Sequence, residues 1–100
     1  HAHPVLAEAL YRQALELEHV IFASFTHRPA TELARALIEY TDCAFTKVFY
    51  SDNGSTAVEI ALKMALQYWI NRGEPRHKII ALELAFHGDT FGAMSVSSRG

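Results

Sequence analysis

The chain has 100 residues, of which half are hydrophobic and a fifth are charged, a balance typical of one small globular domain rather than a disordered chain. Nine basic against eleven acidic residues give a net charge of -2, which argues against nucleic acid or an anionic membrane as a partner. The single Cys43 cannot form an internal disulfide, so we expect a cytoplasmic location.

Two helices are predicted in the N-terminal part of the chain. Residues 4–18 place their apolar side chains three and four positions apart, and Pro4 suits the first position of a helix. Residues 19–27 show no helical period and predict an extended connection, after which a second helix is expected over 29–40. We assign residues 1–45 to an N-terminal helical segment that leads into the next domain.

The second half of the chain predicts the start of an α/β domain, over residues 46–100. The short apolar runs 47–50 and 78–83 are rich in strand-forming residues, and a long helix is expected between them, over 55–72. Strand, helix and strand at this spacing predict two parallel strands with a right-handed crossover. The predicted fold class is therefore α/β, with two N-terminal helices followed by a parallel βαβ unit.

The long predicted helix over 55–72 is apolar nearly all round. Its charged and amide side chains form one narrow stripe that includes Glu59, Lys63 and Gln67, so the segment is not a membrane span. Glu59 and Lys63 are spaced to form an ion pair. A helix this apolar has to be buried against a large partner surface, which 100 residues barely supply. We therefore expect a piece of a longer, incomplete domain, in agreement with a chain that starts at His1 without Met.

The first candidate site is the turn 51–56, between the first predicted strand and the long helix. Gly54 lets the backbone approach a ligand closely, and the amides of Gly54, Ser55 and Thr56 would point outward where the helix dipole favours an anion. The Ser55 hydroxyl adds a donor, so the turn could hold a phosphate. The alternative is a helix cap, because Thr56 and Glu59 fit a capping box. The two are compatible, since a cap satisfies only some of the free amides.

The second candidate site is the loop 86–90, which would lie at the same edge of the sheet, where ligands of α/β proteins bind. Phe86 could stack on a flat cofactor or belong to the core. His87 could orient such a cofactor or be an ordinary loop histidine. Asp89 could cap a helix that starts near Thr90. The histidines of the chain show no spacing typical of a metal site.

The residues of both turns resemble a known family. The run Tyr50-Ser51-Asp52-Asn53-Gly54-Ser55-Thr56-Ala57-Val58-Glu59 and the run 87–95 are similar to the class III, fold-type I pyridoxal-phosphate-dependent aminotransferases. The resemblance covers essentially the whole chain. It implies the large domain of the fold-type I transferases, pyridoxal 5'-phosphate as cofactor, a small-molecule amino donor and keto acceptor, and a homodimer with its sites at the interface.

The resemblance also implies roles for the matching positions. Gly54 and Ser55 would bind the phosphate of the cofactor. Phe86 would lie against the pyridine ring next to the substrates, and His87 and Gly88 would shape that wall. The family usually has Tyr at the stacking position, so Phe86 keeps the ring face but lacks a hydroxyl that can reach the substrate.

The substrates follow from a narrower resemblance. The runs 55–59, 63–65 and 89–95 are most similar to the branch of the family that transfers an amino group from S-adenosylmethionine to 8-amino-7-oxononanoate in biotin biosynthesis. For Asp89 a helix cap is the first expectation, and the resemblance adds a position that faces the substrate as the alternative. Two other hypotheses stay open: an ornithine or ω-amino-acid aminotransferase, and a non-catalytic βαβ unit whose turns are only caps.

No catalytic residue is expected within these 100 residues. In the family, the Schiff-base lysine and the aspartate that pairs with the pyridine nitrogen lie further along the chain. Lys47, Lys63 and Lys78 do not match the lysine motif. The resemblance therefore implies that the parent protein is an aminotransferase and that the chain of residues 1–100 alone is inactive.

Overall fold

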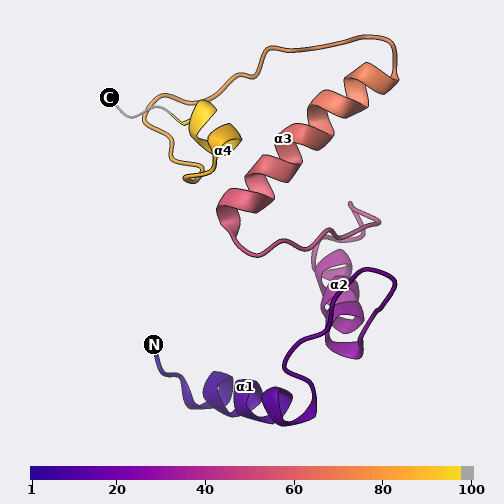
Figure 1. Cartoon of the computed structure of the whole chain (residues 1–100), viewed down its shortest axis with the longest axis vertical. Helices are drawn as coiled ribbons and strands as arrows, with labels where there is room; N and C mark the ends of the chain where they lie inside the picture. The colour runs from indigo at the N-terminus through magenta and orange to yellow at the C-terminus, as the bar shows by residue number, and fades with distance from the viewer. Residues whose placement is uncertain (98–100) are drawn as a thin grey trace. The chain divides into compact units, whose positions relative to one another are not determined.

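The computed structural model describes residues 1–97, which form four helices distributed over two compact units, His1–Val48 and Phe49–Gly100 (Figure 1). No strand forms within residues 1–97, so the segments 47–50 and 78–83 are irregular here. A strand needs a hydrogen-bonded neighbour to become part of a sheet. The parallel βαβ unit stays a prediction. None of the helices described has the length and apolarity that a membrane crossing requires.

Helix α1 spans Pro4–Glu16 and starts at the proline, as the sequence predicts. It ends slightly earlier than predicted because Leu17 adopts an extended conformation, with φ at -163°. The Gln13 side chain stabilises this end, since its Nε2 donates to the Leu17 carbonyl oxygen at 3.0 Å. No residue of α1 is buried, so its apolar stripe has no partner within its unit.

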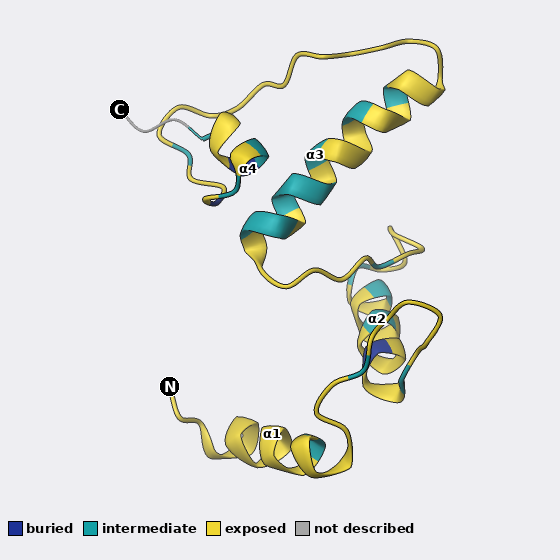
Figure 2. Ribbon diagram, in the orientation of Figure 1, coloured by how far each residue is buried: buried dark blue, intermediate teal, exposed yellow. Residues whose placement is uncertain are grey.

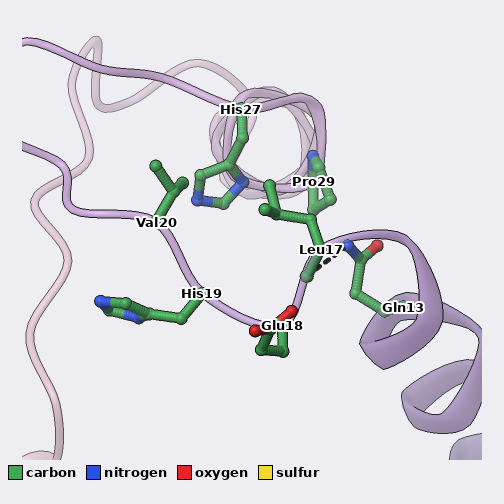
Figure 3. A pocket seen from close by; sticks show the side chains of 7 residues that line it. All are labelled: Gln13, Leu17, Glu18, His19, Val20, His27 and Pro29. Carbon is green, nitrogen blue, oxygen red and sulfur yellow. Dashed lines mark hydrogen bonds between the residues drawn. The ribbon is translucent and has the colours of Figure 1, made fainter.

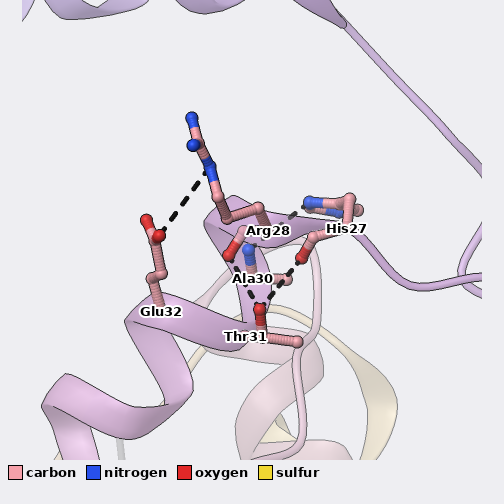
Figure 4. Close-up of polar contacts among 5 residues, drawn as sticks. All are labelled: His27, Arg28, Ala30, Thr31 and Glu32. Carbon is pink, nitrogen blue, oxygen red and sulfur yellow. Dashed lines mark hydrogen bonds and ion pairs between the residues drawn. The ribbon is translucent and has the colours of Figure 1, made fainter.

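Helix α2 spans Arg28–Tyr40, close to the predicted boundaries, and its first turn is fixed by the residue before it. The amide of Ala30 donates to Nδ1 of His27 at 3.4 Å, so this histidine acts as the N-cap (Figure 4). Exposed Arg28 and Glu32 form an ion pair at 3.7 Å on the same turn. His27 therefore has a structural role at the start of α2.

Helix α3 spans Gly54–Asn71 and is capped one turn earlier than predicted. The amide of Thr56 donates to Asn53 Oδ1 at 3.0 Å, and the amide of Asn53 donates to Thr56 Oγ1 at 3.2 Å. The predicted capping box of Thr56 with Glu59 is therefore wrong. Asn53 is extended, with φ at -160°, so its side chain can fold back onto the first turn, whereas Thr56 is already helical. The helix stops before Gly73, which has a φ of +72°.

Helix α4 spans Phe91–Ser95 and follows Thr90, which occupies the N-cap position. The prediction of Asp89 as the N-cap is therefore wrong, because the backbone conformation makes Thr90 the residue that precedes the helix. Thr90 is the last extended residue before the helix, with φ at -75° and ψ at 159°. The Thr90 side chain makes no cap bond to its own helix. Helix α4 contacts α3 within the second unit.

Little of the apolar surface is buried within residues 1–97 (Figure 2). The buried hydrophobic residues are Ala30 and Ala93, at 7% and 0% exposure. Helix α3 contains no buried residue, although Figure 2 shows its first turns less exposed than its last. The sequence predicts that this helix is buried, but residues 1–97 do not cover it.

Candidate functional site

The two candidate turns meet in the second unit, although they are far apart in the sequence. The amide of Asp89 donates to Ser55 Oγ at 3.1 Å across a separation of 34 residues. Thr90 Oγ1 lies 3.2 Å from the carbonyl oxygen of Ser55. Thus the first residues of α3 and the loop before α4 form one local structure, which holds Gly54 and Ser55 together with Gly88 and Asp89.

Gly88 makes this close approach possible. It is buried and has a φ of +131°, a conformation that residues with a side chain rarely adopt. A β-carbon at this position would lie 2.7 Å from the Cα atom of Ser55 and 2.3 Å from its hydroxyl oxygen. Backbone atoms cannot move away as a flexible side chain can. Position 88 therefore has to be glycine for the loop to reach Ser55.

Glu59 is a second link between the turns. Its Oε2 accepts hydrogen bonds from Thr90 Oγ1 at 2.8 Å and from the amide of Ala93 at 3.0 Å. The bond from Thr90 lowers the pKa of this carboxyl from its ordinary value of 4.5; partial burial opposes this effect, and the amides of Ala93 and Gly92 add to it. The predicted ion pair with Lys63 is not among the ion pairs of residues 1–97. Glu59 therefore binds the neighbouring helix as an anion.

This role of Glu59 could not be predicted from the sequence, because its partners are more than thirty positions away. The local pattern offered two nearer partners, Thr56 and Lys63. One indirect signal was present in the glycine at position 92. A β-carbon there would lie 2.6 Å from a carboxylate oxygen of Glu59, so glycine at this position allows the side chain of Glu59 to come close.

The start of α3 retains free hydrogen-bond donors. The amides of Gly54 and Ser55 have no hydrogen-bond acceptor among residues 1–97. A β-carbon added to Gly54 would meet nothing within 4 Å, so no side chain or loop covers this side of the residue. The Ser55 hydroxyl accepts one bond from Asp89 and keeps its own hydrogen for a second partner. The amide of Thr56, in contrast, is used by the cap, so two of the three predicted amides remain available.

The loop that precedes Gly88 is exposed. Phe86 is 60% exposed. The amide of His87 donates to Ser97 Oγ at 3.0 Å, and the Ser97 hydroxyl donates to the carbonyl oxygen of Ala93 at 2.8 Å. The loop is thus tied to α4 at this point and to α3 at Asp89.

The first unit contains a separate cavity of about 170 Å³ between the end of α1 and the start of α2 (Figure 3). Its walls include His19, Glu18 and His27. The Nδ1 of His27 already accepts the bond from Ala30. Within residues 1–97, no group of three or more His, Cys, Asp or Glu side chains is arranged to hold a metal ion. The donors of the second unit therefore remain the better candidate site.

Comparison with known proteins identifies the family. The model of the class-III aminotransferase family matches residues 1–100. The adenosylmethionine-8-amino-7-oxononanoate aminotransferase of Synechococcus elongatus is 60% identical over 99 residues, which cover 99% of this chain and 23% of that protein. The proteins of the same name from Buchnera aphidicola (subspecies Acyrthosiphon pisum) and Mycobacterium leprae are 47% and 43% identical, over 95% and 96% of this chain and 22% of each relative.

The chain spans about a fifth of the length of the curated relatives it matches. The match nevertheless extends over every element described above, including both turns of the candidate site. The chain belongs to the class-III aminotransferase family, which has the fold of the fold-type I pyridoxal-phosphate transferases.

Proposed function

We propose that residues 51–56 form the phosphate-binding turn of a pyridoxal 5'-phosphate-dependent transaminase. The whole protein would transfer an amino group from S-adenosylmethionine to 8-amino-7-oxononanoate, a step of biotin biosynthesis. The names of the relatives and the family match support this activity. The observation that carries the proposal is the pair of amides at the start of α3, those of Gly54 and Ser55, that have no acceptor among residues 1–97.

The donor set fits a phosphate group. The amides of Gly54 and Ser55 lie at the N-terminus of an 18-residue helix, where the helix dipole favours an anion. The Ser55 hydroxyl has a hydrogen left to donate. The cap of Asn53 with Thr56 fixes this turn without using either free amide. A phosphate would therefore meet three donors on a turn that is already ordered.

Other residues would surround the rest of the cofactor. When bound, pyridoxal phosphate supplies the electron-accepting ring on which amino groups are exchanged. We propose that Phe86 covers this ring, that His87 and Gly88 shape the same wall, and that Asp89 faces the substrate. The exposure of Phe86 and the contact of Asp89 with Ser55 support this arrangement. The lysine that carries the cofactor in this family would lie outside these residues, so the chain of residues 1–100 is expected to be inactive.

The same proposal extends to the architecture of the whole protein. Residues 47–50 and 78–83 would become parallel strands once neighbouring strands are present, because strands are stable only within a sheet. The domain boundary near residue 46, the homodimer and the cytoplasmic location are part of the proposal. The substrates would be small molecules, in agreement with the family.

A second candidate function rests on Phe86, which lacks the hydroxyl of the usual stacking tyrosine. The loss of a polar group next to the substrate would suit a different amino donor, as in an ornithine or ω-amino-acid aminotransferase. The full-length protein should be assayed with S-adenosylmethionine and with ornithine as donors. Turnover with S-adenosylmethionine alone supports the first function, and turnover with ornithine alone supports the second.

The phosphate role can be tested by substitution of Gly54 in the full-length protein. Gly54→Asp places a carboxylate in front of the free amides, and we expect it to raise the dissociation constant of pyridoxal phosphate at least about tenfold. An acidic residue in the first turn favours the helix itself, so α3 should stay folded. Gly54→Ala is the control for the β-carbon alone, which meets no atom within 4 Å. Unchanged affinity in a cofactor titration of Gly54→Asp would contradict the phosphate role.

A further inference from the structure

Glu59 lies one helical turn after Ser55, on the same face of α3. Both side chains reach across to the segment 89–93. Ser55 accepts from the amide of Asp89, and Glu59 accepts from Thr90 and from the amide of Ala93. The residue that would hold the phosphate and the residue that binds the loop are therefore fixed to one rigid element.

Helix α4 depends on this contact. It has only five residues, and the Thr90 side chain makes no cap bond to it. The first amides of any helix lack partners inside the helix. Glu59 supplies an acceptor for the amide of Ala93 from another element, in place of the missing cap. A helix of this length has little stability of its own, so we expect its position to follow from this bond and from the buried Ala93.

We propose that Glu59 is a positioning residue for the cofactor site: through Thr90 and Ala93 it holds the loop 86–90 against the phosphate-binding turn before the cofactor binds. The inference rests on the proposed function of that turn. Order imposed in advance lowers the entropy lost on binding, so the contact would increase affinity without touching the cofactor.

The chemistry of Glu59 agrees with positioning and not with proton transfer. A carboxyl that donates a proton near neutral pH needs a raised pKa, whereas the bond from Thr90 lowers the pKa of Glu59. Gly92 leaves just enough room for this carboxylate, since a β-carbon there would lie 2.6 Å and 2.7 Å from its two oxygens. The lowered pKa favours a group that is ionised at neutral pH, and the close fit at Gly92 favours one fixed position for its oxygens.

The test compares Glu59→Ala with Glu59→Gln in the full-length protein. One oxygen of Glu59 accepts both bonds, and the carboxamide oxygen of Gln can replace it. We expect Glu59→Ala to raise the dissociation constant of pyridoxal phosphate about tenfold, and Glu59→Gln to stay within about threefold of the wild type. Titration of the cofactor-free protein with pyridoxal phosphate measures both values.

A second readout does not depend on the cofactor. Hydrogen exchange of the cofactor-free protein should become faster at the amides of Asp89 and Ala93 in Glu59→Ala, at least about tenfold, and stay slow in Glu59→Gln. The amide of Tyr68, near the other end of α3, is the control. If exchange at Tyr68 accelerates equally, the variant is generally destabilised and Glu59 is not a specific positioning residue.

The outcomes separate the two proposals. If Glu59→Ala binds the cofactor like the wild type while Gly54→Asp does not, the positioning role is overturned and the phosphate role stands. If neither variant changes the affinity, both proposals fail. If Glu59→Ala does not fold, the affinity for pyridoxal phosphate is measured instead in Thr90→Val, which loses the hydroxyl, and in Thr90→Ser, which keeps it. Weaker binding by the Val variant alone supports the positioning role, and wild-type binding by both overturns it.

Discussion

Gly88 has the strictest steric requirement in the candidate site. An alanine here would combine a φ of +131° with a β-carbon 2.7 Å from the Cα atom of Ser55. A side chain forced into such a conformation costs on the order of 1–3 kcal/mol. We therefore expect Gly88→Ala to lower the free energy of unfolding of the full-length protein by at least about that amount, as measured by denaturant titration.

Gly54→Ala is the matched control for this substitution. Its β-carbon would meet no atom within 4 Å, and its backbone is helical. We expect it to change the free energy of unfolding by less than about 0.5 kcal/mol, as is usual for exposed positions. Equal effects of the two substitutions would show that the loop 86–90 does not approach Ser55 in the full-length protein.

The contact between α3 and α4 should depend on pH through Glu59. Its pKa is lowered in the folded state, so its stabilising contribution is present above the ordinary value of 4.5 and is lost as the pH falls through the lower folded pKa. We expect the amide signal of Ala93 in the nuclear magnetic resonance spectrum of the full-length protein to titrate with a midpoint below 4.5.

Glu59→Gln provides the control, because it keeps an acceptor but does not titrate in this range. In the wild type, the signal of Ala93 should shift between about pH 6 and pH 3. In Glu59→Gln it should show no such transition. A wild-type midpoint at or above 4.5 would mean that the carboxylate is not held by Thr90 and Ala93.

The elements differ in how well their sequence predicts them. Helices α1, α2 and α3 were predicted to within a few residues, because proline, glycine and apolar spacing are local signals. The cap of α3 was misplaced because both Asn53 with Thr56 and Thr56 with Glu59 fit the spacing of a capping box. Backbone conformation decides between them, and it makes Asn53 the cap. The donors at Gly54 and Ser55 could be predicted from the same local pattern.

The rest of the site could not be predicted because its contacts are not local. The bonds of Ser55 and Glu59 to the segment 89–93 join positions more than thirty residues apart, and no spacing rule covers that distance. The predicted strands illustrate the same limit. Their composition favours a sheet, but a sheet also needs neighbours that residues 1–97 do not provide.

At the scale of the whole molecule, most large apolar side chains are exposed. Ile80 is 97% and Phe91 is 87% exposed, whereas the buried hydrophobic residues described are two alanines. Such a chain cannot gain enough from burial to offset its loss of conformational entropy. The relatives are more than four times as long, and we propose that their additional residues cover these surfaces.

This exposure predicts how the chain behaves alone. We expect residues 1–100 to show a broad thermal transition without a cooperative heat-absorption peak in calorimetry, and the full-length protein to show a sharp one. A sharp peak for residues 1–100 would mean that the two units have a core of their own. That result would also contradict the prediction that α3 needs additional residues to bury its apolar surface.

The bond between Ser55 and Asp89 has a consequence for biosynthesis. During translation the turn 51–56 leaves the ribosome before the loop 86–90, and 34 residues separate the two bonded positions. At typical synthesis rates this delay is roughly 2–7 s, far longer than helix formation requires. Helix α3 can therefore form with its first amides exposed, and its contacts with the loop can form only after residues 89–93 emerge.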